Sequence, residues 1–236
     1  MNEETKSQLN GLAYRIGQLN FEINDWKWLE EQLGKVKMSS DHIYGTFSSL
    51  SRILPKKAVE LLDADREALQ LIAPGFQMRA WDTHRLARML LLLNLRDLME
   101  ADYVQVLNHL FDYADISEMV ALYSSLIVLE YPDHWKSVCV EGIRMNIGLV
   151  HEAIMYDNPY PFFYLDNAAW NQLILKAIFN DMQLAYIVGI YARMNEPLIS
   201  ALLDYVAERE AAGRTVSLPV RELLSLSEKN YSFNMN

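Results

Sequence analysis

Apolar residues recur at the three- and four-residue spacing of α-helices along nearly the whole chain. Near its start, for example, Leu9, Leu12, Ile16 and Leu19 lie on one helical stripe. No window of five or more residues alternates strictly between apolar and polar residues between turn signals, as a half-buried β-strand requires. The sequence therefore predicts an all-α fold, and a β-sheet is not expected.

Capping residues and helix breakers divide this pattern into separate helices. Asp82 or Thr83, Asp166 and Asn195 are suited to cap helix starts, and the sequence from Asp115 to Glu118 has the spacing of a capping box. Glycines and prolines mark several ends. We expect helices over residues 3–19, 23–33, 41–54, 65–72, 83–99, 103–114, 118–129, 134–156, 168–179, 184–190 and 197–212, followed by a short one that begins at Ser217 and Pro219.

The helix expected over residues 83–99 is apolar on nearly every face after Leu86. A helix that is apolar all round must be surrounded by other helices. We therefore place residues 86–98 at the centre of the core, where they should be almost fully buried.

The expected helices vary in length, and no period of 33–47 residues recurs, so a regular repeat array is not favoured. Only nine glycines and seven prolines interrupt the chain, and none of the stretches between helices resembles a linker. The sequence predicts an irregular helical bundle or a stack of helix pairs, similar to an α–α superhelix. Residues 1–226 would form a single domain, and residues 227–236 a polar tail.

The charge balance bounds the possible partners and the location. The chain has 21 lysines and arginines against 31 aspartates and glutamates, a net charge of −10, and no cationic cluster that would bind a nucleic acid. No uninterrupted apolar run is longer than that of residues 89–93, which is far shorter than the roughly 20 residues that a membrane span needs. The first ten residues do not resemble a signal peptide. We therefore expect a cytoplasmic protein without a membrane span.

No catalytic motif is complete in this sequence. His151 and Glu152 begin a zinc-helix motif, but Met155 stands where the second histidine would be needed. The sequence has no serine-nucleophile elbow and no glycine-rich phosphate loop, and its one cysteine, Cys139, lies among apolar neighbours. We expect no metal and no cofactor, and we assign no catalytic residue.

Polar residues gather on one face of the helix expected over residues 134–156, where Glu141, Arg144, Gly148 and His151 are spaced three or four apart. One interpretation is a solvated face with an ordinary ion pair between Glu141 and Arg144. The other is a groove beside the turn at residues 157–161. A glycine inside a helix costs about 1 kcal/mol relative to alanine, which indicates that something packs closely on Gly148.

The segment Asp157-Asn158-Pro159-Tyr160-Pro161 cannot continue a helix, and its Asp157 and Asn158 side chains should bond within the turn as an Asx motif does. We expect the Asn171 amide to hold the backbone of this turn, with direct ligand contact as the alternative. Trp170 could provide a flat apolar wall and Lys176 a cation.

Several blocks of the sequence resemble the EboA family of bacterial proteins, in the order in which that family has them. The most specific are D-N-P-Y-P at residues 157–161 and W-N-Q-x-x-x-K-A at residues 170–177. Weaker matches cover residues 47–57, 74–81, 87–93, 141–146, 187–189, 203–209 and 212–214, whereas the first forty residues match poorly. The resemblance implies a role in clusters that make or move a secondary metabolite or its precursor, without specifying a reaction.

Two functions follow as hypotheses. The first is an accessory protein that binds or carries a small metabolite, or docks to other proteins of the same pathway. The alternative is a small-molecule enzyme with a polar pocket around Arg144, His151, Asp157 and Lys176. Both hypotheses use a candidate binding surface in the C-terminal half of the chain. It consists of Arg144, Asn146, His151, Asp157, Asn158, Trp170, Asn171 and Lys176.

Overall fold

The computed structural model describes the backbone of residues 3–233 and the side chains of residues 4–226. Over this range the chain forms thirteen α-helices and three short 3-10 helices, with no β-strand beyond two isolated bridges, between Ala58 and Asp82 and between Tyr156 and Ile187. The predicted all-α fold is confirmed. None of the helices in the described range has the length and the low polarity needed to cross a bilayer.

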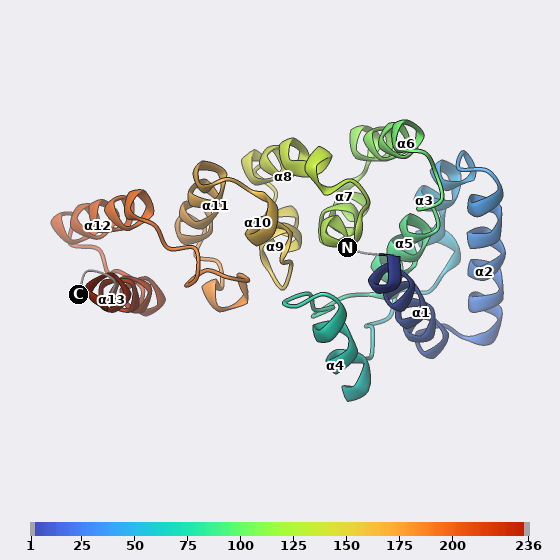
Figure 1. Cartoon of the computed structure of the whole chain (residues 1–236), viewed down its shortest axis with the longest axis horizontal. Helices are drawn as coiled ribbons and strands as arrows, with labels where there is room; N and C mark the ends of the chain where they lie inside the picture. The colour runs from blue at the N-terminus through green and yellow to red at the C-terminus, as the bar shows by residue number, and fades with distance from the viewer. Residues whose placement is uncertain (1–2, 234–236) are drawn as a thin grey trace.

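The α-helices are, in chain order, α1 (Glu3–Asn20), α2 (Ile23–Met38), α3 (His42–Ile53), α4 (Asp63–Ile72), α5 (Thr83–Leu93), α6 (Glu100–Tyr113), α7 (Ile116–Ser124), α8 (Trp135–Arg144), α9 (Gly148–Met155), α10 (Tyr160–Tyr164), α11 (Asn167–Phe179), α12 (Glu196–Ala211) and α13 (Leu218–Phe233). The 3-10 helices are η1 (Leu126–Val128), η2 (Pro132–His134) and η3 (Leu184–Tyr186). From α6 to α12 the helices follow the order of the chain as a row, whereas α1 to α5 pack on one another on the other side of the molecule (Figure 1).

The centre of the N-terminal half is α5, which packs against α1, α2, α3 and α7. Every side chain from Leu86 to Leu93 is buried, as the apolar pattern predicts. The cap at Asp82 is also confirmed, because its carboxylate accepts a hydrogen bond from the backbone N–H of Arg85. The capping residues Asp115, Asp166 and Asn195 bond in the same way at the starts of α7, α11 and α12.

The central helix is shorter than expected, ending at Leu93 rather than at residue 99. The side-chain amide of Asn94 donates to the carbonyl of Leu90, and the backbone N–H of Asn94 bonds to the carbonyls of Leu91 and Leu92. The chain then turns, and Leu95 is still buried whereas Asp97 is exposed. Asn94 therefore ends the helix inside what the sequence presents as one apolar run.

The single helix expected over residues 134–156 is wrong, since the chain forms α8 and α9 with an extended break at residues 145–147. The ring Nε2–H of His151 donates to the carbonyl of Met145 at 2.6 Å, which satisfies a backbone group that the break would leave unpaired. Gly148 is consequently the first residue of α9, and a Cβ atom there would meet nothing within 4 Å. The expected shared face and the expected close packing on Gly148 are both wrong.

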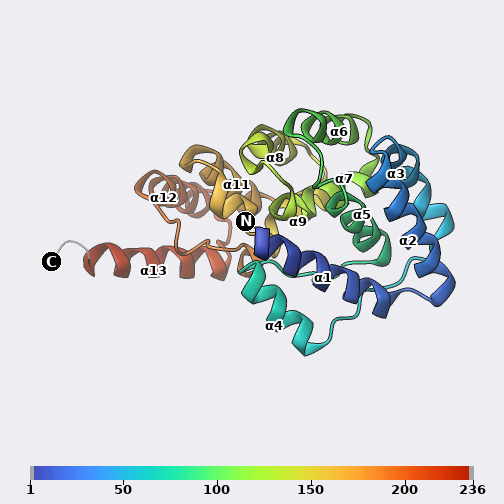
Figure 2. The ribbon, with the colours of Figure 1, turned by 45° about the vertical axis from the view of Figure 1, so that its right-hand side comes forward.

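Beyond α9 the row continues through α11, which packs against α8, α9 and α12. α13 packs on α12 and extends from the rest of the molecule (Figure 2). It is longer than the short helix expected here, since its backbone is helical to Phe233. The helix thus covers most of the predicted polar tail, and residues 234–236 of that tail lie outside the described residues.

Candidate functional site

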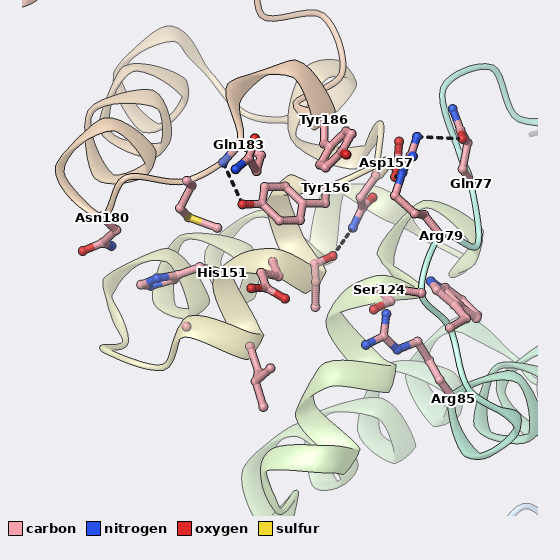
Figure 3. A pocket seen from close by; sticks show the side chains of 18 of the residues that line it. Gln77, Arg79, Arg85, Ser124, His151, Tyr156, Asp157, Asn180, Gln183 and Tyr186 are labelled. Atoms are coloured by element: carbon pink, nitrogen blue, oxygen red, sulfur yellow. Dashed lines mark hydrogen bonds and ion pairs between the residues drawn. The ribbon is translucent and has the colours of Figure 1, made fainter. Parts of the chain in front are cut away.

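A cavity of about 790 Å³ opens where the N-terminal half of the chain meets the C-terminal half. Its walls come from the loop before α5, the first turn of α5, the end of α7, α9 with the segment after it, and the loop around η3 (Figure 3). The lining consists of Phe76, Gln77, Arg79, Ala80, Trp81, Arg85, Ser124, Asn146, Gly148, Leu149, His151, Glu152, Ala153, Tyr156, Asp157, Asn158, Asn180, Asp181, Met182, Gln183 and Tyr186.

Backbone hydrogen bonds connect three of these walls. The N–H of Gln77 donates to the carbonyl of Asp157 at 3.0 Å, and the N–H of Asp157 donates to the carbonyl of Tyr186 at 2.9 Å. The hydroxyl of Tyr156 accepts from the N–H of Gln183 at 2.8 Å. These hydrogen bonds fix three segments that are far apart in the sequence relative to one another, so the cavity walls are held in place by the protein itself.

Arg79 lies at the edge of the cavity and contacts three of its other lining residues. Its Nε donates to the Asp157 carboxylate at 2.7 Å, its Nη2 donates to the Gln77 side chain at 3.3 Å, and its guanidinium lies 4.3 Å from the centre of the Tyr186 ring. The hydrogen bond to Asp157 raises the pKa of Arg79 above its ordinary value. Arg79 therefore links the loop before α5 to the segment after α9, and we call its bond to Asp157 the Arg79 clasp.

Arg85 lies in the first turn of α5 and its side chain reaches the cavity on the side of α7 and Ser124 (Figure 3). Its guanidinium lies 5.5 Å from the centre of the Trp81 ring. Within the described residues its buried Nε has no hydrogen-bond partner, and no carboxylate forms an ion pair with it. Burial lowers the pKa of Arg85, yet an arginine stays protonated in a protein. The cavity thus contains a cation with unused donors.

The lining also concentrates unusual backbone geometry. Among the described residues other than glycine, four have a positive φ, and three of them, Ala80, Asp157 and Asp181, line the cavity. Such a conformation costs about 1–3 kcal/mol and persists where the surrounding structure enforces it. Ala80 has no polar side chain to stabilise it, so the hydrogen bonds around it must hold the loop. Backbone strain of this kind is concentrated at functional sites.

The structure brings four of the eight predicted surface residues to this cavity, namely Asn146, His151, Asp157 and Asn158. Asn158 forms the predicted Asx motif, because its side-chain oxygen accepts from the N–H of Tyr160 at 3.1 Å. Its amide also donates to the carbonyls of Tyr123 and Ala153, which fixes the segment on α7 and α9. The same expectation for Asp157 is wrong, because its carboxylate bonds to Arg79 from another part of the chain.

The other four predicted residues lie outside the cavity lining. Arg144 is exposed and pairs with Glu141 at 2.8 Å, which matches the solvated ion-pair interpretation. Trp170 is fully buried, with the Arg193 guanidinium 4.8 Å from the centre of its ring. Lys176 lies on α11 and is half-buried.

The expected role of Asn171 in holding the turn at residues 157–161 is wrong. The Asn171 amide donates to the side chain of Asn195 at 2.9 Å, and Asn195 returns a bond of 2.8 Å. Arg193 instead secures α10, which follows the turn, by donating from Nη1 to the carbonyls of Pro161, Phe162 and Leu165.

Sequence reasoning missed Arg79, Arg85 and the aromatic side chains of Tyr156 and Tyr186. One signal was available for Arg85, because a cation at the start of a largely apolar helix must find a partner, a cavity or water. No local pattern marks the other three, since their neighbours come from distant segments. Chemically, the cavity combines aromatic walls, side-chain amides and an unused cation. It can hold a small polar molecule and orient one of its charged groups.

Comparison with known proteins gives one match that covers most of the chain. Residues 12–225 match a protein family described as "Metabolite traffic protein EboA". Neither the curated proteins nor the solved structures include a significant match to this chain.

Proposed function

The chain belongs to the EboA family of metabolite traffic proteins, and from this premise we propose that it is a carrier that holds a small metabolite in the cavity between its two halves. It would serve the biosynthesis of a secondary metabolite or the transport of its precursor. In this role the chain binds the molecule, protects it and presents it to other proteins of the same pathway. We place this activity in the cytoplasm.

The observation that carries the proposal is the cavity itself. Its volume of about 790 Å³ lies within the roughly 300–1,000 Å³ that is typical of small-molecule sites. The Gln77–Asp157 and Asp157–Tyr186 backbone bonds hold its walls together without a ligand, and preformed walls reduce the ordering cost of binding. An enzyme around Arg144, His151, Asp157 and Lys176 has less support, because only His151 and Asp157 line the cavity.

The test is to fill the cavity from a position that tolerates a side chain. Gly148 lines the cavity, and a Cβ atom there would meet nothing within 4 Å, so Gly148→Phe should place a ring in the cavity and leave the fold intact. The matched control is Gly45→Phe on α3, where a Cβ atom also meets nothing within 4 Å and the residue is exposed. Each protein is purified, incubated with a small-molecule extract of producing cells, washed, and analysed by untargeted mass spectrometry.

We expect the wild-type protein and Gly45→Phe to retain the same compound and Gly148→Phe to lose it, with equal melting temperatures for all three. Retention of that compound by Gly148→Phe would place binding elsewhere on the molecule. A wild-type protein that retains no compound would contradict the carrier function.

A further inference from the structure

We propose that the molecule held in this cavity carries an oxyanion, a carboxylate or a phosphate group, and that the Arg85 guanidinium binds it. The inference rests on the proposed carrier function and specifies the chemical class of the cargo. It is carried by the unused donors of Arg85, by the charges around them and by a second set of free donors in the same cavity.

Arg85 is partly buried, and unlike Arg88 and Arg96 it has no carboxylate within ion-pair distance among the described residues. Arg88 and Arg96 also have buried nitrogens without hydrogen bonds, but each lies near a carboxylate, at 3.8 Å from Glu118 and 3.1 Å from Glu130 respectively. For Arg85 the described residues provide no ion pair within 4 Å. The Arg85 Nε–H is buried and has no acceptor, so it has lost its hydration without compensation. A bound oxyanion would restore that loss.

The carboxylates near Arg85 do not neutralise it by contact. Asp82 accepts from the backbone N–H of Arg85 and pairs with Lys56 at 3.2 Å; it attracts the Arg85 guanidinium electrostatically but forms no ion pair with it within 4 Å. Asp157 is engaged by Arg79. Glu152 on α9 attracts Arg85 electrostatically but is exposed, and Asp181 on the opposite wall is exposed as well. The Arg85 Nε–H thus has no acceptor among the described residues and is available to an incoming oxyanion.

A second group of donors lines the same cavity at the start of α9. The backbone N–H groups of Gly148 and Leu149 have no acceptor among the described residues, and Ile147 provides no side-chain cap. Free amides and the helix dipole both favour negative charge at this position. Gly148, Leu149 and Arg85 line one cavity, so two sets of donors that favour an anion belong to the same lining, which also includes Glu152, Asp157 and Asp181.

The aromatic side chains of the cavity indicate the shape and polarity of the rest of the bound molecule. Trp81 lies beneath the Arg85 guanidinium, and stacking on an aromatic face leaves the edge of the guanidinium available for a two-pronged bond to an oxyanion. Phe76, Tyr156 and Tyr186 add further ring surface to the lining. A flat, partly apolar molecule with one oxyanionic group fits this combination.

The experiment compares small probes that differ in charge but have the same ring. Benzoate and benzamide have nearly the same shape, and phenyl phosphate separates a preference for phosphate from one for carboxylate. Binding is measured by calorimetry and by the ¹H–¹⁵N signal of the Arg85 Nε–H. The variants are Arg85→Gln and Arg85→Lys, and the control is Arg52→Ala, an exposed arginine on α3.

We expect the wild-type protein and Arg52→Ala to bind benzoate or phenyl phosphate at least about tenfold more tightly than benzamide, the effect of one hydrogen bond to a charged group. Arg85→Gln should abolish this preference, and Arg85→Lys should retain part of it because the charge remains. The Arg85 Nε–H signal should shift with the anionic probes and not with benzamide. If Arg85→Gln does not fold, two other measurements test whether Arg85 binds the oxyanion. They are the Arg85 Nε–H signal of the wild-type protein and the binding of the probes by Arg85→Lys.

Equal binding of benzoate and benzamide would overturn oxyanion recognition, as would an Arg85 signal that no probe shifts. The carrier function would survive either result if Gly148→Phe still lost the captured compound. The opposite result is also informative: anionic probes shift the Arg85 Nε–H signal, but the wild-type protein retains no metabolite. This result would contradict the carrier function while supporting an anion-binding site at Arg85.

Discussion

The core around α5 and the cavity between the two halves differ in the side chains that form them and in the interactions that hold them together. In the core, all side chains from Leu86 to Leu93 are buried, and Arg88 is the one charged residue among them. In the cavity, the walls mix polar and aromatic side chains, and three residues adopt strained backbone conformations. Helix periodicity specifies the core, whereas hydrogen bonds between distant loops specify the cavity.

This difference separates the residues that maintain the fold from those that form the site. Removing atoms from the core should lower the free energy of unfolding, because apolar contacts are lost on all sides. Changing the cavity should mainly affect the local connection between Arg79 and Asp157, with smaller global effects. Three substitutions test this contrast.

The largest effect is expected for Leu92→Ala. Leu92 is 1% exposed, and emptying a leucine site in a packed core costs about 2–5 kcal/mol of unfolding free energy. Chemical denaturation measures the loss. Leu203→Ala on α12 is the matched control, because Leu203 is 48% exposed and a surface change stays within about 0.5 kcal/mol. Equal losses at the two positions would mean that α5 is not the centre of the core.

A smaller and more local effect is expected for Asp157→Asn, which keeps the shape of the side chain and removes its charge. Arg79 is half-exposed and can turn to water, so the loss should be about 1–2 kcal/mol. The backbone N–H of Gln77, which donates to Asp157, should exchange faster with solvent than in the wild-type protein.

The control for this change is Glu141→Gln, which breaks the exposed pair with Arg144 and should cost less than about 0.5 kcal/mol. If the Gln77 amide kept its wild-type exchange rate in Asp157→Asn, the Arg79 clasp would not be what holds the loop.

The smallest effect is expected where the two regions meet, at the Asp82 cap of α5. Burial of the Asp82 carboxylate opposes its ionisation, but hydrogen bonds from the Arg85 N–H and from Lys56 outweigh this and lower its pKa. The unfolded chain, with an aspartate pKa of about 3.9, then takes up the proton more readily than the folded one. The stabilisation is present above about pH 4 and disappears as the pH falls through the lower folded-state pKa.

Asp82→Asn keeps a capping oxygen but does not titrate, so its melting temperature should fall less than that of the wild-type protein between pH 5 and pH 2. Asp112→Asn, at an exposed position on α6, should behave like the wild-type protein. Parallel acid profiles for wild type and Asp82→Asn would show that the cap contributes no pH-dependent stability.

Local chemistry made much of the core predictable. The apolar run after Leu86 and the caps at Asp82, Asp115, Asp166 and Asn195 depend on residues within a few positions of one another. The break between α8 and α9 was not predictable, because Met145 and Ile147 are ordinary helix residues. What maintains the break is the bond from His151 to the Met145 carbonyl, which no helical spacing indicates.

The candidate site was predictable only in part, on the side that one stretch of sequence forms. Residues 146–158 contain Asn146, His151, Asp157 and Asn158, and the sequence pointed to all four. Arg79 meets Asp157 across a separation of 78 residues, and the position of Arg85 depends on how that loop folds back. Contacts of this range follow from the packing of whole helices, which residue spacing does not encode.

The arrangement of the cavity walls along the chain also has a consequence for synthesis. The first wall ends at Arg85, the middle ones lie within residues 124–158, and the last is complete only at Tyr186. A growing chain can therefore assemble α1 to α7 around α5 while the cavity is still open on one side. Joining the first wall to the segment after α9 brings together Arg79 and Asp157, which are 78 residues apart. The entropic cost of this contact increases only slowly with the length of the loop between them. Any fragment that stops before Tyr186 lacks a wall of the cavity, so the complete cavity exists only after synthesis has passed this point.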